Sequence, residues 1–78
     1  MESQLTEYQY CVNEIERYRN LREDIDKEAI LIRQKMKNTQ NSADIAMLKN
    51  RMKELYELDE KYGAKMHELA IRRNLLEE

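Results

Sequence analysis

Apolar residues recur every three or four positions along the second half of the chain. From Ile45 to Leu76 the steps alternate between three and four, which is the heptad repeat of a coiled-coil helix. The positions are Ile45, Leu48, Met52, Leu55, Asp59, Tyr62, Met66, Leu69, Arg73 and Leu76. A helix with such a stripe buries it, so the pattern predicts a second helix packed alongside.

A stripe of the same length runs through the first half of the chain. Its positions are Leu5, Tyr8, Val12, Ile15, Tyr18, Arg22, Ile25, Ala29, Ile32 and Met36. Two steps of three follow each other between Val12 and Tyr18, which predicts tighter winding or looser packing there. If the chain folds back near Gln40, the stripes pair as an antiparallel seam in which the two residue numbers of each pair add up to 80 or 81. The only acidic position of the second stripe, Asp59, then faces the only basic position of the first, Arg22.

Five consecutive polar residues, from Asn38 to Ser42, separate the two stripes. Their side chains compete for backbone hydrogen bonds and favour turns and helix caps. The sequence therefore predicts a helix over about 3–37, a turn over 38–42 and a helix over about 43–76. With no Pro and one Gly in 78 residues, the expected fold is a single all-α domain, an antiparallel two-helix hairpin of coiled-coil type.

Several residues are placed to shape the helices. Ser3 is expected to cap the first helix, and Asn41 or Ser42 the second. Asn38 is the best candidate for a left-handed residue after the first helix. Gly63 lies inside the second helix, where it either lets another group approach closely or is tolerated at a cost of about 1 kcal/mol.

Eight apolar residues lie off the seam and would be exposed on a single hairpin: Leu21, Ile30, Leu31, Met47, Tyr56, Leu58, Ile71 and Leu75. We call these eight residues the predicted partner face. Two helices bury only a small core, so this face is expected to be buried against a second copy of the chain or another helical protein. Two hairpins packed face to face would make a four-helix bundle.

The charges are unevenly distributed, although the net charge is only −2. Six bases, against Asp44 alone, lie between residues 33 and 53: Arg33, Lys35, Lys37, Lys49, Arg51 and Lys53. Residues 2–28 carry eight acids and four bases, and residues 54–78 carry seven acids and four bases. The hairpin would therefore have a basic tip at its closed end and an acidic open end. Nucleic-acid binding through the basic tip is the alternative function, although no aromatic residues lie between its cations.

Residues that usually carry catalysis or bind metals are scarce. One His67 and one Cys11 are present, with no CxxC or HExxH spacing, and a phosphate-binding loop would need more than the single glycine. His67 is expected on the solvent face, and Cys11 is expected to be a buried small hydrophobe rather than a link between two chains. The sequence therefore predicts no enzyme, no cofactor, no metal and no small-molecule substrate.

The string Leu21-Arg22-Glu23-Asp24-Ile25-Asp26 resembles the opening of the all-helical chorismate mutases, which implies basic side chains that bind a dicarboxylate. The resemblance covers these six residues. The next element of that family's pattern, an apolar residue followed by Asp, is replaced by Glu28-Ala29, and no third helix is predicted. The prediction of a non-enzymatic chain is therefore unchanged.

No apolar run approaches the roughly 18 residues needed to cross a membrane. The first four residues, from Met1 to Gln4, lack the basic and apolar regions of a signal peptide. A cytoplasmic location without membrane contact is therefore expected. Taken together, the patterns predict a protein–protein interaction module, such as a small adaptor, chaperone or complex subunit, that self-associates or packs its apolar faces on a partner.

Overall fold

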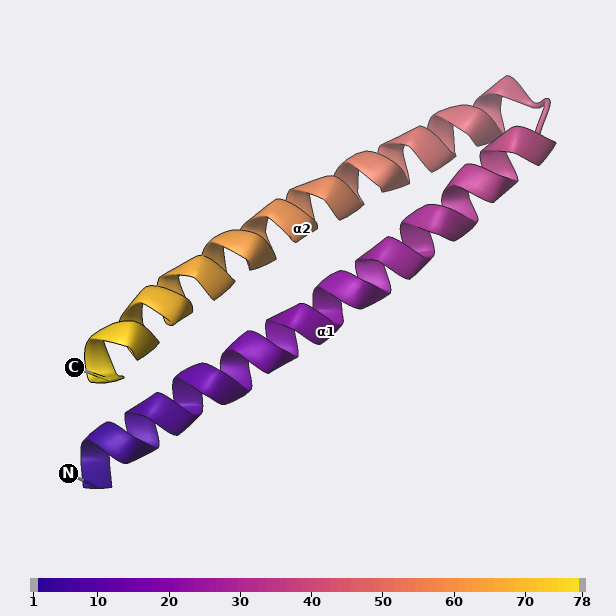
Figure 1. The fold of residues 1–78 in the computed structure, drawn as a ribbon. Coiled ribbons are helices and arrows are strands. Elements are labelled where there is room, and N and C mark those ends of the chain that lie inside the picture. The colour runs from indigo at the N-terminus through magenta and orange to yellow at the C-terminus, as the bar shows by residue number, and fades with distance from the viewer. Residues whose placement is uncertain (1, 78) are drawn as a thin grey trace.

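Two long α-helices lie side by side in opposite directions and form a rod of 60 × 15 × 14 Å (Figure 1). The structure, a computed structural model, describes the backbone of residues 2–77 and the side chains of residues 6–77. α1 spans Glu2–Asn38 and α2 spans Ser42–Glu77, so each helix extends one residue further at both ends than expected. The predicted all-α antiparallel hairpin is confirmed. The predicted Ser3 cap and the pairing of Leu5 with Leu76 lie outside the described side chains.

The connection between the helices, residues 39–41, ends in a side-chain cap. Asn41 Oδ1 accepts hydrogen bonds from the backbone N–H groups of Ala43 at 2.9 Å and Asp44 at 3.4 Å. The carbonyl of Asn41 accepts the bond from the N–H of Ile45 at 3.1 Å. Asn41 therefore satisfies the free donors at the start of α2, which is the role of an N-cap residue. Of the two predicted candidates, the structure selects this one.

The expected left-handed conformation of Asn38 is wrong. No residue other than glycine has a positive φ in the described backbone, and Asn38 is the last helical residue of α1. A left-handed conformation is costly for residues with a Cβ atom. The three residues 39–41 reverse the chain without one, and so avoid that cost.

The buried core lies in the half of the hairpin nearer the closed end. Its members are Ile25, Ala29 and Ile32 from α1 and Met52 and Leu55 from α2. Met36, Leu48, Leu58 and Tyr62 are partly buried and pack against these five residues. Leu55 is 2% exposed and is the most deeply buried leucine among residues 6–77. Burial of this cluster is the main hydrophobic contribution that holds α1 against α2.

A second buried site, in the half nearer the open end, changes the predicted seam. Cys11 is fully buried and Ile15 is nearly so, whereas Val12 is only half-buried. The steps from Tyr8 to Cys11, Ile15 and Tyr18 are three, four and three, so the heptad spacing is unbroken. Between Tyr8 and Tyr18 the expected change of winding is therefore not needed; in the predicted stripe the two successive steps of three now fall at Leu5, Tyr8 and Cys11. Cys11 is a buried free thiol, as expected, and is not placed to link two chains.

The remaining seam residues are half-buried: Tyr8, Val12, Tyr18, Arg22, Ile45, Leu48, Asp59, Tyr62, Met66, Leu69 and Arg73. Two contacts between the helices set their register. Arg22 donates two hydrogen bonds to Asp59, Nε to Oδ1 at 2.9 Å and Nη2 to Oδ2 at 3.3 Å. The rings of Tyr18 and Tyr62 lie 5.5 Å apart between centroids. The two hydrogen bonds between Arg22 and Asp59 raise the pKa of Arg22, because the carboxylate stabilises the charged guanidinium.

Gly63 lies beneath the guanidinium of Arg22. A Cβ atom added at Gly63 would lie 3.4 Å from Nη1 and 3.5 Å from Cζ of Arg22, which are ordinary contact distances. Since the backbone of Gly63 has no positive φ, alanine fits there. We therefore expect Gly63→Ala to raise the free energy of unfolding by about 0.5–1 kcal/mol, through its better helix propensity.

Urea denaturation monitored by circular dichroism at 222 nm measures this change. Gly63→Leu is the matched control, because it has a similarly high helix propensity but places a large side chain where the guanidinium lies. It should be less stable than Gly63→Ala. If Gly63→Ala itself destabilises the hairpin, close approach of Arg22 requires glycine and the expectation is wrong.

Candidate protein-binding surface

Seven large apolar side chains are exposed among those that the structure describes: Tyr10, Ile30, Leu31, Met47, Tyr56, Ile71 and Leu75. Six of them belong to the eight predicted for the partner face, and Tyr10 is an exposed residue outside that prediction. The other two, Leu21 and Leu58, are half-buried. Leu58 packs against the core, because its position borders the seam. The hairpin thus leaves most of this apolar set in contact with water.

Polar contacts between the helices mark two opposite faces of the hairpin. On one face Arg51 donates to Glu28, with Nη2 3.1 Å from Oε1. On the other face Arg33 Nη2 donates to the hydroxyl oxygen of Tyr56 at 2.8 Å. Helical spacing from these two contacts assigns the exposed apolar residues to one face or the other.

Six apolar residues share the face of the Glu28–Arg51 pair: Tyr10, Leu21, Leu31, Met47, Leu58 and Leu75. Leu31 follows Glu28 by three residues and Met47 precedes Arg51 by four, so each lies beside its charged neighbour. The others lie one, three or four whole heptads from one of these four residues. Heptad spacing keeps a residue in the same place relative to the partner helix. We call this surface the Leu31 face.

The predicted partner face is therefore not one surface. Ile30 and Tyr56 lie on the opposite face, where they line one hollow together with Arg33. That hollow shares no residue with the groove beside Leu31. Ile71 points away from α1, because it lies midway between two seam positions of its helix.

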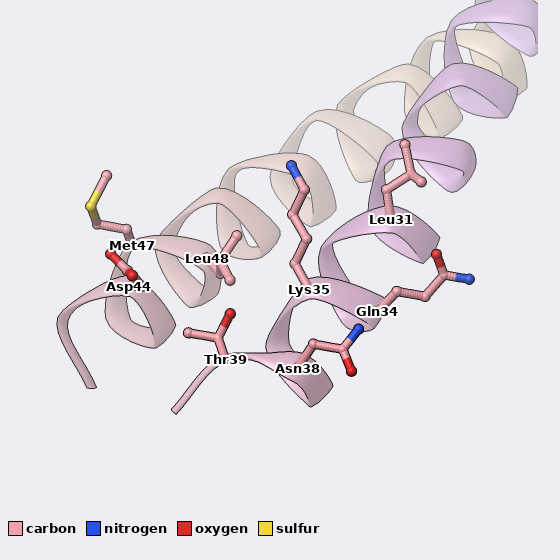
Figure 2. A pocket seen from close by; sticks show the side chains of 8 residues that line it. All are labelled: Leu31, Gln34, Lys35, Asn38, Thr39, Asp44, Met47 and Leu48. Atoms are coloured by element: carbon pink, nitrogen blue, oxygen red, sulfur yellow. The ribbon is translucent and has the colours of Figure 1, made fainter. Parts of the chain in front are cut away.

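A groove on the Leu31 face lies next to the connection between the helices. It has a volume of about 570 Å³. Its lining residues are Leu31, Gln34, Lys35, Asn38, Thr39, Asp44, Met47 and Leu48. Figure 2 shows Leu31 and Lys35 projecting from α1, and Met47 and Leu48 from α2. Apolar walls with a few polar groups at the rim suit the side chains of an amphipathic helix.

Two cations of the basic tip are already bound within the hairpin. Arg51 is bound to Glu28 and, through Nη1 at 3.0 Å, to Glu54. These hydrogen bonds raise the pKa of Arg51, and the same guanidinium lowers the pKa of Glu28 below its usual value. Arg33 is bound to Tyr56. Binding of a phosphate by either arginine would therefore break a contact between the helices.

The exposed lysines of the basic tip are divided between the two faces. Lys35 lines the groove on the Leu31 face. Lys49 and Lys53 line a hollow with Tyr56 on the opposite face, and Lys37 lies in the last turn of α1, where a positive charge complements the helix dipole. Arg33 lines the same hollow as Lys49 and Lys53, so three of the six basic residues lie together there, beside the carboxylates of Glu57 and Glu60. The six do not all converge on one groove, and nucleic-acid binding stays a prediction.

The described residues contain no group of three or more His, Cys, Asp or Glu side chains arranged to hold a metal ion. Cys11 is buried and His67 is exposed. Within residues 2–77, neither helix has a stretch apolar enough to cross a membrane. The apolar Leu31 face is therefore the strongest candidate site in this part of the chain.

Comparisons with protein-family models, with curated proteins and with solved structures find no match to this chain. No relative therefore supplies a function. What the hairpin can do has to be inferred from its own surface.

Proposed function

We propose that this hairpin is a non-enzymatic protein-binding module that docks its Leu31 face on another helical chain. The observation that supports this proposal is the exposure of four apolar residues on that face, Leu31 and Met47 near the closed end and Tyr10 and Leu75 near the open end. An adaptor, a chaperone and a complex subunit all work through binding alone. The partner is a second copy or a different helical protein.

The physical reason for docking is the cost of exposed apolar surface. Leu31 is 56% exposed, and Met47 and Leu75 are more exposed still. Burying a side chain of this type stabilises a complex by about 1.5–3 kcal/mol relative to leaving it in water. Exposed apolar patches, such as the one where Leu31 and Met47 line the same groove, commonly mark interaction sites. The groove beside Leu31 supplies the concave shape into which a partner's side chains would fit.

The test is site-specific photo-crosslinking in cells that naturally make the protein. A photoreactive amino acid at Met47 should give discrete adducts with one or a few proteins, identified by mass spectrometry. The control carries the same photoreactive amino acid at Asn50, an exposed position of α2 that faces away from α1, and measures non-specific crosslinking. Equal adducts at both positions, or none at Met47, would overturn the proposal.

A pair of neighbouring substitutions then assigns the face. Leu31 and Ile30 are 56% and 53% exposed and lie on opposite faces. Leu31→Glu should reduce the Met47 adduct at least tenfold, because it places a charge in the proposed interface. Ile30→Glu introduces the same charge next to it and should leave the adduct intact. Loss of the adduct in both variants to the same extent would mean that a general change of charge, rather than the Leu31 face, is responsible.

A further inference from the structure

We propose that the Leu31 face binds a second copy of this chain in antiparallel orientation, with the closed end of each copy over the open end of the other. This inference rests on the proposed function and names its partner. Two features carry it: the spacing of the apolar residues along the face, and the opposite charges of the two ends of the rod.

The apolar residues of the Leu31 face are arranged almost symmetrically about the middle of the hairpin. Leu21 lies near the middle, with Leu31 ten residues nearer the closed end and Tyr10 eleven residues nearer the open end. At 1.5 Å per residue both are about 15–17 Å from Leu21. On α2, Met47 lies near the closed end and Leu75 near the open end, 12 and 16 residues from Asp59, so their match is offset by about one helical turn. A two-fold axis beside Leu21 would therefore place Leu31 of one copy over Tyr10 of the other.

The same rotation brings opposite charges together on α1. Lys35 lies fourteen residues after Leu21 and Glu7 fourteen residues before it, so Lys35 of one copy meets Glu7 of the other. Both lie on the Leu31 face, because they are whole heptads from Glu28. Glu14 and Glu28 also meet; these two carboxylates, like Glu7, are each already ion-paired with an arginine of their own copy. Because the arginines neutralise Glu14 and Glu28, the approach of Lys35 to Glu7 is the net contribution along α1, and Lys35 would share Glu7 with Arg72.

The α2 helices match in the same way. Arg51 of one copy meets Glu68 of the other, and Glu54 meets Lys65; the residue numbers of each pair add up to 119. Within each copy Arg51 is already paired with Glu54, and Lys65 with Glu68, so the two pairs of one copy would meet those of the other with opposite charges facing. The centre of these pairs lies just after Asp59, level with Leu21 across the seam. A single axis therefore serves both helices, as a symmetric dimer requires.

The overall charge favours this orientation over the parallel one. Residues 33–53, at the closed end, carry six bases and one acid, whereas residues 2–28 and 54–78 both have an excess of acids. A parallel dimer would stack the two basic tips on each other and the two acidic ends on each other. Like charges placed together across an interface are unfavourable and suppress that arrangement. The antiparallel dimer would be a four-helix bundle in which every helix has antiparallel neighbours.

Cysteine crosslinking on a Cys11→Ala background, shown to be folded by circular dichroism, tests the orientation. Leu21→Cys near the axis should be joined efficiently by a short bismaleimide. Leu31→Cys should not be, because two copies of this residue would lie about 30 Å apart. A mixture of Leu31→Cys with Tyr10→Cys should give the crosslinked heterodimer. Ile71→Cys, on the outer edge of α2, measures crosslinking by chance collision.

Sedimentation equilibrium of the unaltered chain should give twice its mass of 9.5 kDa at micromolar concentration. A monomer would overturn the second copy as the partner, and the Met47 crosslinking experiment would then decide separately whether the face binds another protein. A dimer in which Leu31→Cys crosslinks with itself and Leu21→Cys does not exceed Ile71→Cys would overturn the antiparallel orientation.

Discussion

Leu55→Ala is expected to lower the free energy of unfolding by about 2–5 kcal/mol. Leu55 is 2% exposed and lies in the core cluster that joins α1 to α2. Truncation removes its buried methyl groups and leaves a cavity beside Ile25 and Met52. A hairpin has only these two helices, so it has little other core with which to offset the loss. We expect the variant to be largely unfolded at 25 °C.

Urea denaturation at a fixed protein concentration, followed by circular dichroism at 222 nm, measures this loss. The matched control is Ile71→Ala, which removes an aliphatic side chain that is 49% exposed on the outer edge of α2. That change should stay within about 0.5 kcal/mol. If both variants unfold at the same urea concentration, Leu55 does not contribute more than a surface residue and the described core is wrong.

The fold could be predicted because the spacing of apolar residues along the chain identifies the seam between the helices. A heptad stripe identifies the buried side of each helix, and a polar segment between two stripes of equal length permits only a short connection. The Arg22–Asp59 contact observed in the structure joins the two charged seam positions that the sequence sets opposite one another. This agreement fixes which residues of α1 lie level with which residues of α2.

At Cys11 the structure differs from the predicted seam. The apolar pattern predicts Val12 as the seam residue, but Cys11 is the residue that is fully buried. Counted back from Arg22, alternating steps of four and three lead through Tyr18 and Ile15 to Cys11 and Tyr8, and only Leu5 then breaks the alternation. Spacing was therefore the better guide than residue type, because a small thiol packs as a hydrophobe.

The candidate site was harder to predict than the fold. The sequence pattern predicts one partner face that contains both Ile30 and Leu31, yet the two residues lie on opposite faces of the hairpin. Likewise, six clustered bases suggested one basic tip, but Arg33 and Arg51 bind acceptors on opposite faces. Composition shows how many apolar or basic residues are present. Which of them can bind the same partner depends on their position relative to the neighbouring helix. That position follows from the register, which the interhelical contacts supply.

Replacing Arg22 or Asp59 alone by leucine is expected to cost about 1–2 kcal/mol, an intermediate value between exposed and fully buried ion pairs. The two side chains are 40% and 32% exposed and share two hydrogen bonds. Each single change leaves a charge in the seam without its partner, where water reaches it only in part. The double variant should recover much of the loss, because two leucines continue the apolar stripe on both helices.

A double-mutant cycle in urea measures the coupling, and we expect it to exceed about 0.5 kcal/mol. The main contribution of the Arg22–Asp59 pair is then to specify the register of the two helices rather than to raise the free energy of unfolding. A slip of one heptad would set Arg22 against Met52, where no carboxylate meets it, so the charged pair penalises every register but the observed one. The leucine double variant should accordingly be about as stable as the original chain, but its two helices should be held less strictly in one register. The Tyr18–Tyr62 ring contact should then weaken, which lowers the tyrosine signal in the near-ultraviolet circular dichroism spectrum. Additive effects of the two single changes would show that these residues do not set the register of the hairpin.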